Sequence, residues 1–318
     1  MSAVARDPSA SLDVVLPAFN EAANLPALFA QLRGVLGALT PRWRIVLVDD
    51  GSSDDTAAVA LAALAAGLPL RYVQLSRNFG KEAALTAGLA LADADCVLLM
   101  DADGQHAPEL VAQMRSAWLH GADMVCAVRA NRDEEGPLKR LGTSLFYRFV
   151  NAFTQLHIPP DAGDFRLLDR RVVVALNSLP ERNRFMKGLY AWVGYRTEFL
   201  PYTPKLRTNG RSHFSLRRLL HLAFTGVTAF SNLPLRIWSA LGGVIALCAL
   251  AYGAWLIVEH LVYGHPIPGW PTVVVGLMFF SGVQLLSIGI MGEYIGRIFD
   301  EVKQRPVYLV ALDTGKPP

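Results

Sequence analysis

Residues 97–105 read Val-Leu-Leu-Met-Asp-Ala-Asp-Gly-Gln, a short apolar run that ends in two aspartates separated by one alanine. Such a run is typical of a strand that is buried on both faces of a sheet. Asp101 and Asp103, at the end of this strand, can converge on one cation. Hard divalent ions such as Mg²⁺ prefer oxygen ligands and commonly share them with substrate phosphates, and Gln105 could add a neutral oxygen. A solvated turn is the alternative interpretation.

Strand-like and helical patterns alternate on both sides of this run, up to about residue 200. The strand-like runs are residues 12–17, 45–49, 70–75, 96–100 and 124–129. The stretches with helical spacing are residues 22–39, 54–66, 81–92 and 108–120. This alternation predicts an α/β domain whose mainly parallel sheet is covered by helices on both faces. Ligands of such sheets bind beyond the carboxyl ends of the strands.

Polar residues gather at those predicted strand ends. Asp50 follows the second strand, where an acid can bind ribose hydroxyls or a base edge, and Gly51 permits a tight turn. Helix capping by Ser53 or Asp54 is the simpler explanation of that segment. Phe19, after the first strand, offers a flat apolar face, although an ordinary strand-to-helix turn would look the same. The occurrence of these features together at one sheet edge favours a binding site.

The second half of the chain has a different character. Residues 237–258 and 272–292 carry no charged side chain, and about 20 apolar residues suffice for a helix to cross a bilayer. Buried helices of a soluble core are the alternative. Residues 259–271 contain no Lys or Arg, whereas the outer flanks do. The flanking cations are Arg217, Arg218, Arg236, Arg297, Lys303 and Arg305. The positive-inside rule then predicts a multi-pass protein of the cytoplasmic membrane, with both chain ends in the cytoplasm.

Residues 216–230 mix arginines with leucines just before the first predicted span. This pattern favours a helix lying in the membrane interface, although packing on the preceding domain remains an alternative. We therefore expect a catalytic domain over residues 1–214, an interfacial amphipathic helix over 215–234, and a two-span anchor with a short cytoplasmic tail over 235–318. A net charge of +3 without a long basic run predicts no nucleic-acid partner.

Four ordered motifs resemble glycosyltransferase family 2: LPAFNEAANL (16–25), VLVDDGSSDDT (46–56), LSRNFGKEAALTAG (75–88) and MDADGQHAPE (100–109). The resemblance is strongest to dolichyl-phosphate mannosyltransferases and bacterial polyprenyl-phosphate glucosyltransferases. It continues through GDFRLLDR (163–170), LRTNGRSHFSLRRLL (206–220) and GEYIGRIFDEVKQRP (292–306). It implies a GT-A fold and metal-dependent, inverting transfer of a sugar from a nucleotide-sugar to polyprenyl phosphate.

The resemblance also implies roles for the matched positions. The nucleotide-sugar would be bound by Pro17, Phe19, Asn20, Glu21, Asp50, Ser52, Asn78, Lys81, Asp101, Ala102 and Asp103. Mg²⁺ or Mn²⁺ would be held by Asp101, Asp103 and Gln105. The catalytic residues would be Asp103 and Asp164, with Asp164 as the candidate base. The family often has Ser-Lys where this chain has Ser212-His213, which weakens the expected phosphate contact there or makes it pH-dependent.

Arginines are the candidate partners of the acceptor phosphate and the diphosphate, because they donate charge-assisted hydrogen bonds. The candidates are Arg129, Arg132, Arg207, Arg211 and the neighbouring Ser212. For Arg129 and Arg132, the alternative is that they are ordinary solvated surface residues. For Arg207 and Arg211, the alternative is a basic loop that faces the membrane.

By similarity, glucose from a UDP-linked donor is the favoured substrate. Mannose, N-acetylhexosamine, an aminopentose, or a non-catalytic membrane scaffold are the alternatives. A homo-oligomer formed through the predicted spans is a further expectation.

Overall fold

The computed structural model describes residues 6–104, 107–129, 162–182, 184–202, 233–263 and 269–315. The chain divides into two compact units. The first comprises Met1–Ala223 and Arg305–Pro318, and the second comprises Phe224–Gln304. Most of the predicted interfacial helix, up to residue 232, lies outside the described residues, so that helix stays a prediction.

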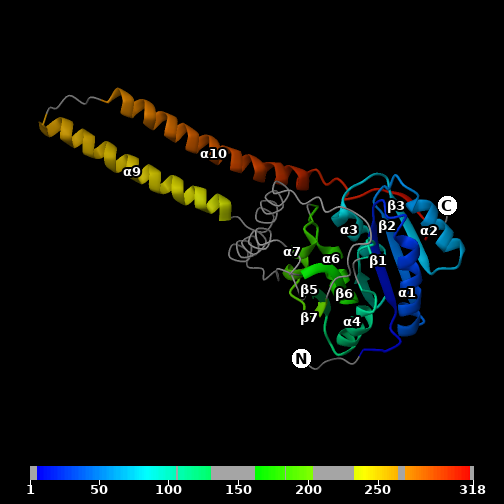
Figure 1. Cartoon of the computed structure of the whole chain (residues 1–318). Helices are drawn as coiled ribbons and strands as arrows, with labels where there is room; N and C mark the ends of the chain where they lie inside the picture. Colours follow the sequence, from blue (N-terminus) through cyan, green and yellow to red (C-terminus); the bar gives the residue numbers. More distant parts are fainter. Residues whose placement is uncertain are drawn as a thin grey trace. The chain divides into compact units, whose positions relative to one another are not determined.

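A mixed sheet forms the centre of the first unit (Figure 1). In the described part of the chain it has eight strands in the order β7-β5-β6-β4-β1-β2-β3-β8. The strands are β1 (Leu12–Ala18), β2 (Trp43–Asp49), β3 (Leu70–Leu75), β4 (Cys96–Leu99), β5 (Met124–Arg129), β6 (Ala162–Asp169), β7 (Thr197–Tyr202) and β8 (Val310–Asp313). Strands β6 and β8 pair with their neighbours in antiparallel fashion, and the other pairs are parallel. The mainly parallel α/β sheet expected from the sequence is therefore confirmed.

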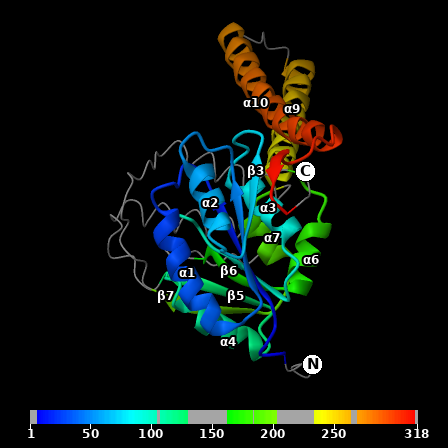
Figure 2. The ribbon, with the colours of Figure 1, turned by 90° about the vertical axis from the view of Figure 1, so that its right-hand side faces the viewer.

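Helices cover both faces of this sheet, as Figure 2 shows. Contacts join α1 (Leu25–Leu39) to α2 (Thr56–Ala65) and to α4 (Leu110–Leu119) on one face. On the other face, α3 (Lys81–Leu91) contacts α6 (Arg170–Ser178), and α7 (Met186–Trp192) packs against β6. All seven residues of β1 are buried. A strand that is covered on both faces has no solvent-facing side, so its sequence does not alternate between apolar and polar residues.

Helix α3 lies unusually close to the central strand. A Cβ atom on Gly88 would be 2.2 Å from Cγ1 of Val15, so this position accepts glycine alone without a shift of the packing. Because α3 is held this close to β1, its first turn is fixed beside the carboxyl ends of β1 and β4. That turn begins with Lys81.

The end of the chain completes the sheet. Strand β8 pairs with β3, and Arg71 makes two hydrogen bonds to the carboxylate of Asp313, from Nε at 2.9 Å and from Nη2 at 2.8 Å. The backbone N–H of Tyr72 donates to Oγ1 of Thr314 at 2.9 Å. The sequence predicted only a cytoplasmic tail here. A four-residue strand is too short to stand out by its pattern.

The second unit contains two long helices, α9 (Leu233–Tyr263) and α10 (Trp270–Val302), which contact each other (Figure 1). They coincide with the two predicted spans. Among the described residues, the segment Gly276–Val302 of α10 is long and apolar enough to cross a membrane. The described part of α9 contains a further apolar stretch, Gly242–Trp255, which is bordered by residues whose side chains are not described. The second span stays a prediction.

Candidate active site

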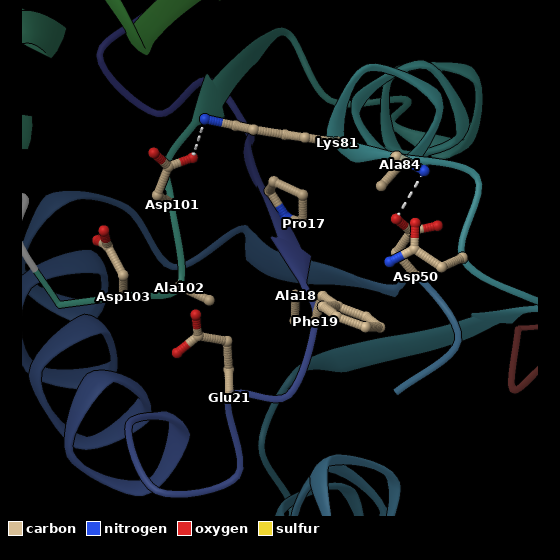
Figure 3. Close-up of a pocket in the computed structure, with 12 residues that line it drawn as sticks. Pro17, Ala18, Phe19, Glu21, Asp50, Lys81, Ala84, Asp101, Ala102 and Asp103 are labelled. Carbon is tan, nitrogen blue, oxygen red and sulfur yellow. Dashed lines mark hydrogen bonds and ion pairs between the residues drawn. The ribbon is translucent and has the colours of Figure 1, made fainter. Parts of the chain in front are cut away.

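A pocket of about 300 Å³ opens at the carboxyl ends of β1, β2 and β4 (Figure 3). Its lining residues are Pro17, Ala18, Phe19, Glu21, Asp50, Asn78, Gly80, Lys81, Ala84, Asp101, Ala102 and Asp103. Nine of the residues predicted to bind the nucleotide-sugar are among them. In Figure 3, Phe19 and Asp50 line one end of this pocket, and Asp101 and Asp103 line the other.

Asp50 fixes the loop after β3 at the first end. Its two carboxylate oxygens accept hydrogen bonds from the backbone N–H groups of Phe79, at 2.7 Å, and Gly80, at 2.8 Å. Burial raises the pKa of Asp50, although these two bonds oppose the rise. Phe19 is 46% exposed, which is unusual for a phenylalanine next to a buried strand. An apolar ring beside a carboxylate suits a planar base with polar edges.

The turn after β2 requires glycine. Gly51 has φ +70°, and a Cβ atom there would lie 2.5 Å from the backbone carbon of Arg77. The turn therefore packs directly against the loop that carries Asn78. The neighbouring Asn20 and Ser52 join two loops instead of lining the pocket. The N–H of Asn20 donates to Oγ of Ser52 at 2.9 Å, and the predicted role of both residues in donor binding stays a prediction.

Lys81 links two carboxylates at the second end. Its Nζ lies 2.7 Å from Oδ1 of Asp101 and 2.7 Å from Oδ2 of Asp164. The sheet explains this arrangement. Strands β4 and β6 are antiparallel and their last pair is Leu99 with Arg166, so Asp101 and Asp164, each two residues beyond that pair, come to the same edge of the sheet. Burial lowers the pKa of Lys81, but the two carboxylates outweigh it, so the pKa is raised and the ammonium stays charged.

Asp164 is ionised although it is buried. Burial raises its pKa, but the charges of Lys81, Lys187 and Arg166 outweigh this and hold the pKa below its usual range. Its Oδ1 atom is buried, and within the described residues it has no hydrogen-bond partner. A buried charged oxygen without a partner is costly, so it is available to a group that arrives with the substrate.

Asp101 and Asp103 suit a divalent cation. Mg²⁺ is commonly held by one or two carboxylates together with substrate phosphates, and two carboxylates line this pocket. Glu21 also lines it, and its pKa is raised by burial first and then by the charges of Asp103 and Asp101. Among the described residues, no group of three His, Cys, Asp or Glu side chains could hold a metal by itself. The donor set therefore fits an ion that arrives with a diphosphate.

Several predicted residues are not part of this description. Outside the described residues lie Gln105, Arg132, Arg207, Arg211 and Ser212. Arg129 ends β5, but its side chain is not described. Their roles stay predictions.

Sequence reasoning missed Ala18, Gly80 and Ala84, because small apolar side chains carry no chemical signal. It also missed Glu82, whose only signal was its place inside the motif LSRNFGKEAALTAG.

Two family models match the chain. Glycosyl transferase family 2 matches residues 13–176, and the GtrB C-terminal hairpin matches residues 233–298. An uncharacterized glycosyltransferase of Synechocystis sp. is 43% identical over 94% of this chain and 94% of its own. A bactoprenol glucosyl transferase of Shigella phage SfV is 41% identical over 96% of this chain and 99% of its own. A prophage-derived bactoprenol glucosyl transferase of Shigella flexneri is 42% identical over 94% of this chain and 97% of its own.

Among solved structures, the glucosyl-3-phosphoglycerate synthase of Mycobacterium tuberculosis resembles the chain with a TM-score of 0.50 and 20% identity. The match covers 69% of this chain and 76% of that one. That protein was crystallised with Mn²⁺, uridine diphosphate and phosphoglyceric acid. At this level of identity, the likeness establishes the shared GT-A-like fold alone.

Proposed function

This chain belongs to glycosyl transferase family 2, and from that premise we propose that it transfers glucose from a nucleotide diphosphate sugar to the phosphate of a polyprenyl lipid. Uridine diphosphate is the favoured donor nucleotide, by the resemblance of the motifs. The bactoprenol glucosyl transferases are similar to this chain over nearly their whole length. Their names support glucose as the transferred sugar and a polyprenyl lipid as the acceptor.

The main support for the proposal is that one pocket has a site for a base and ribose at one end and carboxylates that suit a metal-bound diphosphate at the other. Phe19 and Asp50 offer an apolar face and a carboxylate to a base and its ribose, and Asp101 and Asp103 offer oxygens at the opposite end. A nucleotide diphosphate sugar has the same order of groups, from an aromatic base through a ribose to a charged diphosphate. In this proposal, the sugar projects from the diphosphate end of the pocket toward the acceptor.

The chain's own residues would prepare the donor for a single displacement. Asp101 and Asp103 would hold Mg²⁺ or Mn²⁺, which when bound would act as a Lewis acid on the departing diphosphate. Lys81, which stays protonated, forms an ion pair with Asp101 and adds positive charge to this end of the pocket. A single displacement inverts the anomeric configuration, so an α-linked donor gives a β-linked product.

The acceptor needs little activation. A phosphate monoester has a second pKa of about 6, so it is largely dianionic at neutral pH and is itself a nucleophile. Asp164 would therefore orient the acceptor or take a residual proton through its buried Oδ1 atom. Its low pKa fits this modest role, because a strong base would require a pKa near the working pH.

The second unit would bring the chain to its lipid. A polyprenyl tail stays in the bilayer, because each buried methylene is worth about 0.8 kcal/mol. The apolar segment of α10 and the match to the GtrB C-terminal hairpin support membrane attachment of this unit. Two spans with both ends in the cytoplasm are part of the proposal, and reporter fusions at the chain ends and between residues 264 and 268 test them.

The deciding experiment incubates purified protein in detergent with polyprenyl phosphate, a panel of nucleotide-sugars, and Mg²⁺ or Mn²⁺. We expect the mass of the lipid to increase by one glucose with UDP-glucose, and excess chelator to abolish the product. Transfer of another sugar instead would overturn the assignment of glucose. A protein that binds no nucleotide-sugar in the presence of metal would be a scaffold, and the whole proposal would fail.

A further inference from the structure

Glu82 follows Lys81 in the first turn of α3 and connects that helix to α7. Its side chain is half-buried, and its Oε2 atom accepts a hydrogen bond from the backbone N–H of Met186 at 3.0 Å. Met186 is the first residue of α7, so its N–H has no acceptor within the helix. The preceding residue, Phe185, has no polar side chain to serve as a cap. Glu82 therefore supplies the missing acceptor from an element 104 positions away in the sequence.

Helix α7 is in turn fixed to the strand that carries Asp164. Its Tyr190 ring is buried, and the guanidinium of Arg166, on β6, lies 4.4 Å from the centre of that ring. The same Arg166 donates from Nε to the backbone oxygen of Gly163 at 2.9 Å. Asp164 lies between these two residues in the chain. A shift of α7 would therefore be transmitted to the backbone on both sides of Asp164.

Two consecutive residues of α3 thus hold the same part of β6. Lys81 contacts Asp164 directly, and Glu82 reaches it through Met186 and α7. Glu82 itself does not line the pocket, which separates it from the residues that face the substrate. A side chain in this position can affect the geometry of the reaction without touching the donor.

The charges around Glu82 differ from those around Asp164. Burial raises the pKa of Glu82 to about 7, and the charge of Asp164 adds to the rise, while the N–H of Met186 and the charges of Lys81 and Lys187 oppose it. Tyr190 also faces this group, but its own pKa is raised well above 10 by burial, so it stays neutral. Of the two neighbouring carboxyl groups, Glu82 is the one that takes up a proton near neutral pH.

We propose that Glu82 is a positioning residue that holds α7 against the start of α3 and thereby keeps Asp164 aligned with Lys81 and the pocket during sugar transfer. This role rests on the proposed function above. It requires an acceptor oxygen at position 82, since that oxygen is what holds the N–H of Met186. A protonated Glu82 keeps its carbonyl oxygen as an acceptor, so this role does not depend on the charge of the group.

The test compares Glu82→Ala, Glu82→Gln and the control Glu198→Ala, which changes an exposed glutamate on β7. Loss of the acceptor in Glu82→Ala should lower kcat roughly tenfold or more, because small displacements near the reacting groups are costly. KM for the nucleotide-sugar should change by less than about threefold, since the pocket lining is intact. Glu82→Gln keeps the oxygen and should stay within about threefold of the wild type at pH 7, as should Glu198→Ala.

One further measurement separates positioning from general damage. Hydrogen exchange of the amides of residues 186–192 should be faster in Glu82→Ala and unchanged in Glu82→Gln. The proposal is overturned if Glu82→Ala keeps kcat, or if α7 exchanges at the wild-type rate. If the wild type transfers no sugar to lipid, the proposed function fails, while the exchange measurement still decides whether Glu82 holds α7.

Discussion

Lys81 and Asp164 form an ion pair of 2.7 Å between two elements that meet only because β6 is inserted beside β4 in the antiparallel direction. The same ammonium lies 2.7 Å from Asp101, so one cation serves two carboxylates at the edge of the sheet. Burial alone would raise the pKa of Asp164, and Lys81 is the largest of the influences that lower it. The ionised state of Asp164 therefore depends on Lys81.

Replacing Lys81 by methionine should move the acid limb of the kcat profile to higher pH. A carboxyl whose pKa is lowered stays ionised down to lower pH, so removal of the lowering charge makes it protonate at higher pH. The matched control is Lys187→Met, because Lys187 also lowers the pKa of Asp164 but has a smaller influence than Lys81. A larger displacement of the limb in Lys187→Met than in Lys81→Met would contradict this explanation.

Asp103→Ala should lose nearly all activity, whereas Asp164→Asn should keep a measurable rate. A bound metal contributes several kcal/mol of charge stabilisation, so loss of one carboxylate ligand should cost at least about a hundredfold. The acceptor phosphate is already ionised near neutral pH, so it needs little help from Asp164. Initial rates and calorimetric titration with the nucleotide-sugar check both variants. Equal losses, with donor binding intact in Asp164→Asn, would show that Asp164 is an essential base.

Gly51→Ala should destabilise the protein far more than Gly67→Ala. Both glycines have positive φ, +70° and +78°, so both alanines would carry backbone strain of about 1 kcal/mol. At Gly67 there is open space, whereas at Gly51 the new Cβ would meet the backbone of Arg77 at 2.5 Å. The extra cost at Gly51 should be at least about 2 kcal/mol. Urea unfolding measures both variants, and similar midpoints for the two would contradict the packing described here.

Asp313→Ala should lower the free energy of unfolding by about 1–3 kcal/mol, since Arg71 then loses both hydrogen bonds at a mostly buried site. The control is Asp93→Ala. Asp93 also pairs with an arginine, Arg44 at 2.6 Å, but it is 73% exposed. An exposed pair of this kind is worth less than about 1 kcal/mol. Hydrogen exchange of the β3 amides should rise in Asp313→Ala alone. Unchanged β3 exchange would mean that the tail does not stabilise this edge.

The sequence predicts β1 to β5 because each is a short apolar run in a sheet buried on both faces. It does not predict β6, whose segment Ala-Gly-Asp-Phe-Arg-Leu-Leu-Asp mixes charges into the run, or the four-residue β8. The same limit applies to the site. Asp50, Asp101 and Asp103 are found because they follow recognisable strands. The contact between Lys81 and Asp164 depends on the register of β6, which no local pattern encodes.

The position of β8 has a consequence for how the chain is made. Arg71 cannot form its hydrogen bonds until Asp313, 242 positions later, has been synthesised. The ribosome translates both long helices of the second unit before it reaches that residue. During this interval the edge of β3 presents unpaired backbone groups, which other strands can bind. Closure of the edge is thus a late event in biosynthesis.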